Sequence, residues 1–427
     1  MFLFNKKQYN NNMGSVFFSR LFWIIILFSF IAWFVGILID PQGSQIDVFH
    51  IRMKDFWGDA TVVTHFVKDK NPYINPGANY PPLPYMMYYI LALVSVVPDG
   101  GYQQYYYQPL WSITFFLFLF VTVGMLWQIC VKQLQETTHV DAVMVGLTFC
   151  LSAPMLYTLE RGNAILPSVL FASIFVFYYD SNSKWKKEVA LISLAIATSI
   201  KLVPGVFGLL LLCNRDWKGV LRVSLYTVLF LFLPFFFFEG GLNNVQRLYH
   251  NLYGFLDHYA VDGAVSGTGL VAGVFKLGKS FFGESYGMNV STYNFLRYIS
   301  VQVSAVLFLS IFHLEEKWKQ AFNLNIILLI FPSVAFQYYF LYSIPVIVLF
   351  LNASASRFIE NKLTNSMDKM VVLASFIMIY FVYRCSLSNF FDQHFAVLLL
   401  TIVGVYYSIQ AFRKSGHILP RWLFHGQ

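Results

Sequence analysis

Charged side chains are scarce in this 427-residue sequence, where Asp, Glu, Lys and Arg together account for 12% of the residues. Soluble domains contain about 25% charged residues, so this composition excludes an ordinary water-soluble fold. Hydrophobic residues make up 57% of the chain and aromatic residues 19%. Several apolar runs reach the ~20 residues that cross a bilayer, so we expect an all-α polytopic membrane protein with about 11–13 transmembrane helices.

Cysteine is also rare in this chain. The four cysteines lie in or beside apolar runs and lack the spacing of a metal site: Cys130, Cys150, Cys213 and Cys385. They predict neither a disulfide scaffold nor a metal centre. The sequence also lacks the Gly-rich turns of a Rossmann fingerprint or a P-loop. No nucleotide, metal or other cofactor is therefore predicted.

Apolar runs predict the membrane segments, and the longest of them is long enough for two helices. The first run is too long for a cleavable signal peptide, and no small-residue cleavage pattern follows it. The predicted spans lie near residues 20–39, 81–98, 108–131, 140–158, 164–179, 188–213, 220–238, 294–313, 322–352, 370–388 and 394–411. No polar part is large enough to fold alone, so we expect one integral-membrane domain over residues 1–427.

Basic residues give the orientation, because cytoplasmic loops are enriched in Lys and Arg. Lys6, Lys7 and Arg20 place the N-terminus in the cytoplasm, so the polar segment 40–80 faces outward. The lysines and arginines of the later loops place the second large polar segment, 239–293, on the same external side. The net charge of +8 therefore indicates topology rather than a nucleic-acid surface.

This orientation makes two demands on the apolar runs. Residues 188–213 must form a hairpin of two short helices, for which Pro204 supplies a break. Residues 81–98, which open with Pro81-Pro82, must dip into the membrane without crossing it. Otherwise one of the span assignments is wrong.

Polar residues inside apolar runs need a reason, because a charge at a helix centre costs about 2.5–3.5 kcal/mol on insertion scales. Lys201 lies at the expected helix break, where its ammonium either snorkels to the interface or faces an anion such as a lipid phosphate. The Glu160-Arg161-Gly162-Asn163 segment joins two apolar runs. It is either a solvated tight turn or part of a cavity, in which Arg161 would suit bidentate contact with a phosphate.

The external segments contain the candidate carboxylates. Asp55 and Asp59 are four residues apart, so they share one face if this part is helical. A solvated loop helix is the alternative. Asp257 and His258 could contact a sugar or be ordinary loop residues. Gln337 follows a proline in a membrane run, where it could bind sugar hydroxyls or simply cap two half-helices.

The order of these motifs resembles glycosyltransferase family 87, whose GT-C-type membrane enzymes include polyprenyl-phosphate-mannose-dependent mannosyltransferases. Members carry an Asp in the first external loop upstream of a Pro-Tyr pair, and Asp55 precedes Pro72-Tyr73 in this way. The matching elements after this pair are Tyr80-Pro-Pro82, Arg161-Gly162-Asn163 and Lys201-Leu-Val-Pro204. The family's Gly-Gln-x-Asn element lacks its glutamine here, and its late Ser-Pro element is matched only weakly at Phe331-Pro332, without the histidine.

The resemblance implies a GT-C-like fold with 40–80 as the catalytic external loop. It implies inverting transfer of a hexose, mannose-like, from a polyprenyl-phosphate donor to a cell-envelope glycan or glycolipid acceptor. Asp55 would be the general base, and Arg161 and Lys201 would stabilise the leaving phosphate. The remaining site residues would orient the sugar or the acceptor: Asp59, Tyr80, Asn163 and Gln337. Some GT-C relatives use a divalent cation, which Asp55 with Asp59 could hold, although none is predicted.

Two other functions fit the same architecture. A polysaccharide polymerase or ligase also uses a lipid-linked donor, but one joined through a diphosphate. A lipid-linked sugar flippase or transporter would place charges in broken helices, and it should show an internal repeat with paired interrupted segments. The segments 40–80 and 239–293 match in neither length nor content. The bias toward Phe, Tyr, Asn and Lys suggests a bacterial inner membrane.

Overall fold

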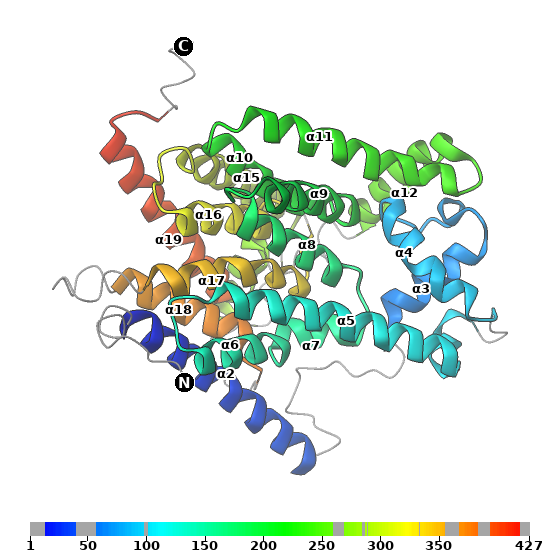
Figure 1. The fold of residues 1–427 in the computed structure, drawn as a ribbon, viewed down its shortest axis with the longest axis horizontal. Helices are drawn as coiled ribbons and strands as arrows, with labels where there is room; N and C mark the ends of the chain where they lie inside the picture. The colour runs from blue at the N-terminus through cyan, green and yellow to red at the C-terminus, as the bar shows by residue number, and fades with distance from the viewer. Residues whose placement is uncertain are drawn as a thin grey trace. The chain divides into compact units, whose positions relative to one another are not determined.

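The computed structural model describes residues 13–39, 57–97, 101–258, 269–283, 287, 289–332, 334–354, 367–382 and 393–418. Every regular element in these ranges is helical, and none is a strand (Figure 1). Within the same ranges, four helices are long and apolar enough to cross a membrane, or five if one bent pair counts as a single span. The prediction of an all-α polytopic membrane protein is confirmed.

The helices follow the apolar runs closely. The four candidate spans are α2 (Met13–Ile39), α5 (Pro109–Gln133), the helix from Trp217 to Phe237 and α19 (Gln393–Ser415). The bent pair, with an angle of 45° at its break, is α6 (His139–Cys150) and α7 (Ala153–Arg161). The other predicted runs correspond to α8 (Ile165–Tyr178), α15 (Val290–Ser310) and α18 (Met367–Tyr380).

Two breaks predicted from the sequence are present. The run 322–352 divides into α16 (Lys317–Ile330) and α17 (Ile344–Ala353), which are joined through the 3₁₀ helix η7 (Gln337–Ser343). The first half ends just before Phe331-Pro332, as expected for a chain that approaches a proline. This run is therefore two helices, as predicted.

The run 188–213 forms the predicted hairpin. Its first arm is α9 (Lys184–Ile200), and its second arm is η4 (Val203–Gly208) followed by α10 (Leu209–Cys213). The second arm returns along the first, because a Cβ on Gly205 would lie 3.1 Å from Thr198 Cγ2 and one on Gly208 3.3 Å from Leu194 Cδ2. The turn places Lys201 directly after the last residue of α9, at its C-terminal cap.

Helix α4 (Pro82–Leu93) is too short to cross a bilayer. Its 12 residues correspond to about 18 Å at 1.5 Å per residue, against a hydrocarbon core of about 30 Å. That 81–98 enters the membrane without crossing it stays a prediction.

The chain divides into two compact units. The first contains residues 1–48, 127–155 and 264–427, and the second contains 49–126 and 156–263. The expectation of one domain over residues 1–427 stays a prediction.

Buried polar contacts hold the first unit together. Asn323 of α16 donates to Ser310 Oγ at 2.9 Å and lies 3.2 Å from Ser408 Oγ of α19. Asp141, at the start of α6, accepts hydrogen bonds from Arg20 and Trp23 of α2 at 3.2 and 3.1 Å. These bonds satisfy polar groups that no lipid could satisfy.

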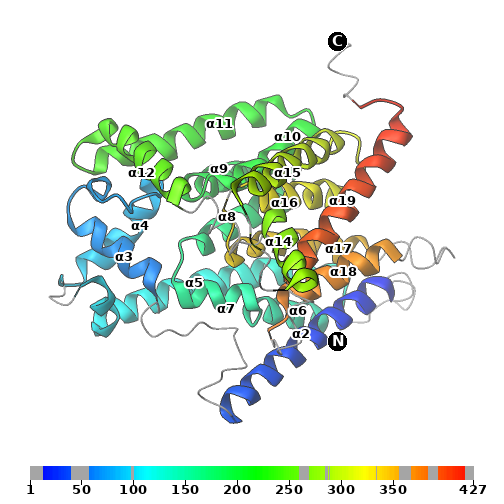
Figure 2. The same ribbon diagram turned by 180° about the vertical axis from the view of Figure 1, so that it is seen from behind.

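In the second unit, α8 is the central helix and is buried on nearly all sides. Helix α9 packs between α8 and α11 (Trp217–Phe232), and the three lie side by side in both views (Figures 1 and 2). Glu188 of α9 bonds to Arg222 and Tyr226 of α11, and Lys187 forms an ion pair with Asp216 at 2.7 Å. These contacts fasten the basic ends of α9 and α11 to each other.

We predict that Gly146→Ala destabilises the first unit. A Cβ at this position would lie 2.7 Å from Trp127 Cδ1 and 3.0 Å from Val131 Cγ2, so two packed side chains would have to shift. The expected loss is about 1–3 kcal/mol of unfolding free energy, measured as a lower melting temperature in detergent. The matched control is Gly124→Ala on α5, where a Cβ meets nothing within 4 Å. An equal melting temperature for the two variants would contradict the close packing.

Candidate functional site

The site begins where helix α3 (Gly58–Lys68) meets the end of α7. Trp57, just before α3, has φ +52°, a left-handed conformation that is rare outside glycine, asparagine and aspartate. Its amide donates to the Glu160 carbonyl at 2.7 Å. Its ring packs against Trp111 and Phe115, with centroids 5.8 and 5.2 Å away. These contacts fix the position of the first turn of α3 against the α7–α8 turn.

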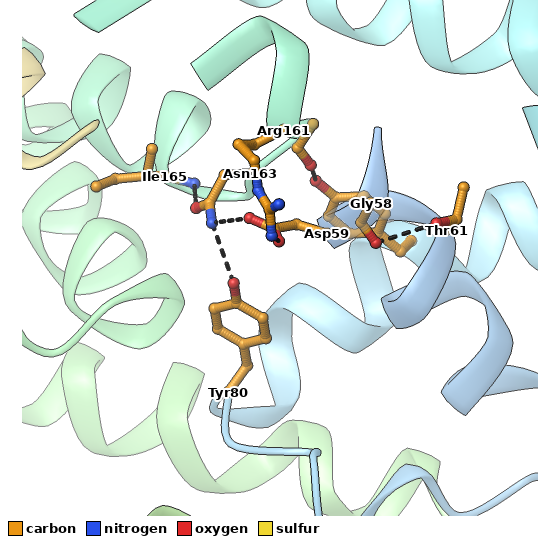
Figure 3. Close-up of polar contacts among 9 residues, drawn as sticks. Gly58, Asp59, Thr61, Tyr80, Arg161, Asn163 and Ile165 are labelled. Carbon is orange, nitrogen blue, oxygen red and sulfur yellow. Dashed lines mark hydrogen bonds and ion pairs between the residues drawn. The ribbon is translucent and has the colours of Figure 1, made fainter. Parts of the chain in front are cut away.

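Asp59, in that first turn, is the centre of the cluster (Figure 3). Arg161 Nη2 donates to its Oδ1 at 2.6 Å, and Asn163 Nδ2 donates to its Oδ2 at 2.6 Å. The side chains of Asp59 and Arg161 are 18% and 31% exposed, so the ion pair is only partly screened by water. Both oxygens of this carboxylate therefore have a strong donor.

Gly162 allows its two neighbours to face the same carboxylate. It has φ +65°, and a Cβ would lie 3.0 Å from both Ala60 Cβ and Phe115 Cζ. Only glycine avoids both the strain and the clash. The Tyr88 hydroxyl donates to the Gly162 carbonyl at 2.9 Å, which anchors the turn on α4.

Asn163 has its amide orientation fixed from both ends. Its Oδ1 accepts the Ile165 amide at 2.9 Å, which caps the start of α8. Its Nδ2 therefore points to Asp59 and also donates to the Tyr80 hydroxyl at 3.2 Å (Figure 3). One side chain thus connects the α8 terminus, the carboxylate and the phenol.

Lys201 and Tyr80 complete the cluster. The Lys201 ammonium lies 4.1 Å from the centre of the Tyr80 ring, a cation–π contact, and it is attracted by the Asp59 charge. Burial, then the negative charge of Asp59, raises the pKa of Tyr80 well above its usual value, so the phenol stays protonated. Because the Tyr80 oxygen accepts from Asn163, its own proton can be donated to another group.

Five described residues make up the cluster: Asp59, Tyr80, Arg161, Asn163 and Lys201. Two of these five side chains, Arg161 and Lys201, are cations, and one, Asp59, is a carboxylate. A guanidinium and an ammonium are the donors that bind phosphate most strongly. Asp59 accepts hydrogen bonds from two donors, so its carboxylate positions Arg161 and Asn163.

Helix α12 (Asn244–His258) fastens the segment that leads to Tyr80. Asn251 Nδ2 lies 3.3, 2.9 and 3.1 Å from the carbonyl oxygens of Tyr73, Asn75 and Ala78. Asn244 accepts a hydrogen bond from Asn71 at 2.9 Å. The sequence alone did not reveal the role of these asparagines, because their partners lie more than 170 residues away in the chain.

The predicted site residues divide into three groups. The structure brings Asp59, Tyr80, Arg161, Asn163 and Lys201 together. Gln337 begins η7 in the other unit. Asp55, the expected base, lies outside the described residues, as do the side chains of Asp257 and His258.

Comparison with known families places the chain. The model of glycosyltransferase family 87 matches residues 79–332, more than half of the sequence. The match includes Tyr80, Arg161, Asn163 and Lys201, and it begins after Asp59. No curated protein matches the chain.

We predict that Asn251→Ala loosens residues 71–80 without unfolding the helices. The substitution removes the donor shared by three carbonyls, and each lost hydrogen bond is worth about 1 kcal/mol. Amide hydrogen exchange in this segment should become about fivefold faster or more. Asn243→Ala is the control, since Asn243 is exposed and no hydrogen bond of its side chain is seen. Equal rates of amide exchange in the two variants would show that Asn251 does not stabilise residues 71–80.

A double-mutant cycle should measure strong coupling between Asp59 and Arg161. Each single change, Asp59→Asn or Arg161→Gln, leaves a partly buried charge without its partner. We expect a coupling free energy of about 1–3 kcal/mol from unfolding in mixed micelles. The exposed pair Lys70–Glu239, 78% and 67% exposed, is the control and should couple by less than about 1 kcal/mol. Equal coupling in both pairs would refute the special role of Asp59.

Proposed function

Since this chain belongs to glycosyltransferase family 87, we propose that it transfers a hexose, mannose-like, from a polyprenyl-phosphate donor. The acceptor is a cell-envelope glycan or glycolipid, and the reaction takes place at the external face of a bacterial inner membrane. The chain is a membrane glycosyltransferase. The cluster around Asp59 is the observation that carries the finer proposal, because its surplus cation suits a phosphate leaving group.

The charge distribution along α9 supports an external site. Lys187, near the start of α9, is paired with Asp216 at the start of α11, in a region rich in basic residues. Lys201 lies 14 residues further along the sequence, or about 21 Å along a helix. Basic clusters stay on the cytoplasmic side. Lys201 therefore approaches the opposite, external face.

The reaction needs a base and an anion-stabilising group. The acceptor oxygen attacks the anomeric carbon while the Asp55 carboxylate takes the hydroxyl proton. The bond from that carbon to the phosphate oxygen breaks, and its electron pair leaves with the polyprenyl phosphate. Attack opposite the leaving group inverts the anomeric carbon. A phosphate leaves readily, so no general acid is needed.

Asp55 is a better candidate for the general base than Asp59. Both oxygens of Asp59 accept hydrogen bonds, from Arg161 and from Asn163, so this carboxylate already holds the cluster together. Asp55 is two residues before Trp57 in the sequence, and two residues reach about 7 Å. Asp55 thus shortly precedes, in the sequence, the residue that is anchored beside the cluster.

The remaining residues have binding roles. Arg161 and Lys201 stabilise the charge that develops on the leaving phosphate, in a site where burial strengthens such contacts. Tyr80, with its retained proton, and Asn163 orient sugar or acceptor hydroxyls. Gln337 remains a proposed sugar contact.

Transfer of radiolabel tests the proposal. Membranes with the wild-type protein should transfer mannose from polyprenyl-phosphate-mannose, and glucose from the corresponding glucose donor less well. Asp55→Asn should lower kcat by about 100-fold or more, the effect of losing a general base. Lys201→Ala should lower transfer similarly, because it removes the cation beside the leaving phosphate.

The control is Lys132→Ala, which changes an exposed lysine at the end of α5 and should leave transfer unchanged. Full activity in Asp55→Asn, with activity lost in Asp59→Asn, would assign the base to Asp59. Label that crosses the bilayer without transfer would identify a flippase. Transfer only from a diphosphate-linked oligosaccharide would identify a polymerase or ligase.

A further inference from the structure

A cavity lies beside α4. It has a volume of about 480 Å³ and is bounded by the end of α3, by α4 and by the end of the 3₁₀ helix η5 (Leu233–Phe237). Its walls include the side chains of Lys68, Lys70, Tyr89, Leu93, Phe237 and Glu239. Helices α3 and α4 lie side by side in both views (Figures 1 and 2).

Helix α4 separates this cavity from the cluster around Asp59. Tyr88 faces the cluster and donates to the Gly162 carbonyl. Tyr89, the next residue, lines the cavity and packs against Phe237 at 5.0 Å between ring centres. Successive residues of a helix point about 100° apart. The cavity is thus a separate site, and binding of a ligand in it does not depend on the proposed function.

The cavity has two cations and one anion on its walls. Lys68 donates to the Ser95 carbonyl, and burial lowers its pKa from the usual value. Lys70 pairs with Glu239 at 3.4 Å, in an exposed position where such a pair is weak. The net charge of these three side chains is positive, so an anion is the favoured guest.

The apolar wall of the cavity continues into a membrane span. The candidate span that starts at Trp217 ends at Phe237, one of the lining residues, so the cavity lies at the height where a span leaves the membrane. Phe237 and Leu93 are 48% and 67% exposed, and Ile90 on the same helix is 59% exposed. The phosphate groups of lipids lie at this height. The acyl chains of such lipids would extend along the apolar wall.

We propose that this cavity binds the phosphate group of an acidic glycerophospholipid. Lys68 and Lys70 contact the phosphate, and the acyl chains lie along Leu93 and Phe237. Glu239 accepts a hydrogen bond from a headgroup hydroxyl, as the glycerol of phosphatidylglycerol would supply. This lipid fits better than the polyprenyl-phosphate donor, because the phosphate of a reacting donor must reach Lys201 and Arg161 on the other side of α4.

Native mass spectrometry of the full chain in detergent tests the proposal, with phosphatidylglycerol and phosphatidylcholine titrated separately. The wild type should bind phosphatidylglycerol about tenfold more tightly. Lys68→Gln should abolish this preference. Lys218→Gln, which removes an exposed lysine from the other end of the same span, should preserve it. Equal binding of both lipids, or an equal effect of the two lysine changes, would overturn the proposal.

Glu239→Gln gives a second test, in which binding should become tighter. Misfolding would weaken binding, so it could not produce this result. The substitution removes the negative charge that competes for Lys70, while the glutamine oxygen still accepts the headgroup hydroxyl. Phosphatidylglycerol should therefore bind about threefold more tightly. Weaker or unchanged binding argues against the proposed pocket. A parallel titration with polyprenyl phosphate separates the two sources of phosphate. Tight binding of polyprenyl phosphate, lost in Lys68→Gln, without binding of phosphatidylglycerol would reassign the cavity to the donor.

Discussion

The bond network of one carboxylate, Asp59, holds the candidate site together. It joins α3 to the turn between α7 and α8, more than 100 residues later in the chain. Without it, the partly buried Arg161 would lose this ion pair, and the Asn163 amide would lose the acceptor that lies 2.6 Å away. The left-handed Trp57 and the glycine at 162 both serve this junction, because each allows the backbone to bring its partner within reach.

The junction also explains how a poorly hydrated site tolerates two cations. A buried ammonium or guanidinium is costly unless a carboxylate lies near it, and the Asp59 carboxylate lowers this cost for Arg161 and Lys201. In the proposed reaction, a phosphate would share these cations with Asp59. This sharing would weaken phosphate binding and favour release of the polyprenyl phosphate.

Much of the fold was predictable, because membrane helices have a local signature. Apolar runs marked the spans, and prolines marked the breaks at 204 and 332. The site was predictable in part: polar residues misplaced in apolar runs identified Lys201 and Arg161. Their partners were not, since a hydrogen bond between Asn71 and Asn244 leaves no pattern in the sequence around either residue. Asp55, named as the base, lies outside the described residues.

Helix α4 gives the second unit two distinct chemical faces. Its tyrosines Tyr85 and Tyr88 are buried, whereas Ile90 is exposed and Leu93 lines the cavity. A helix too short to span cannot be held by the bilayer alone. It is held by the Tyr88 bond to Gly162 on one side and by packing on η5 on the other. A lipid bound in the proposed pocket beside Leu93 would therefore contact the same helix that Tyr88 fastens to the turn at Gly162.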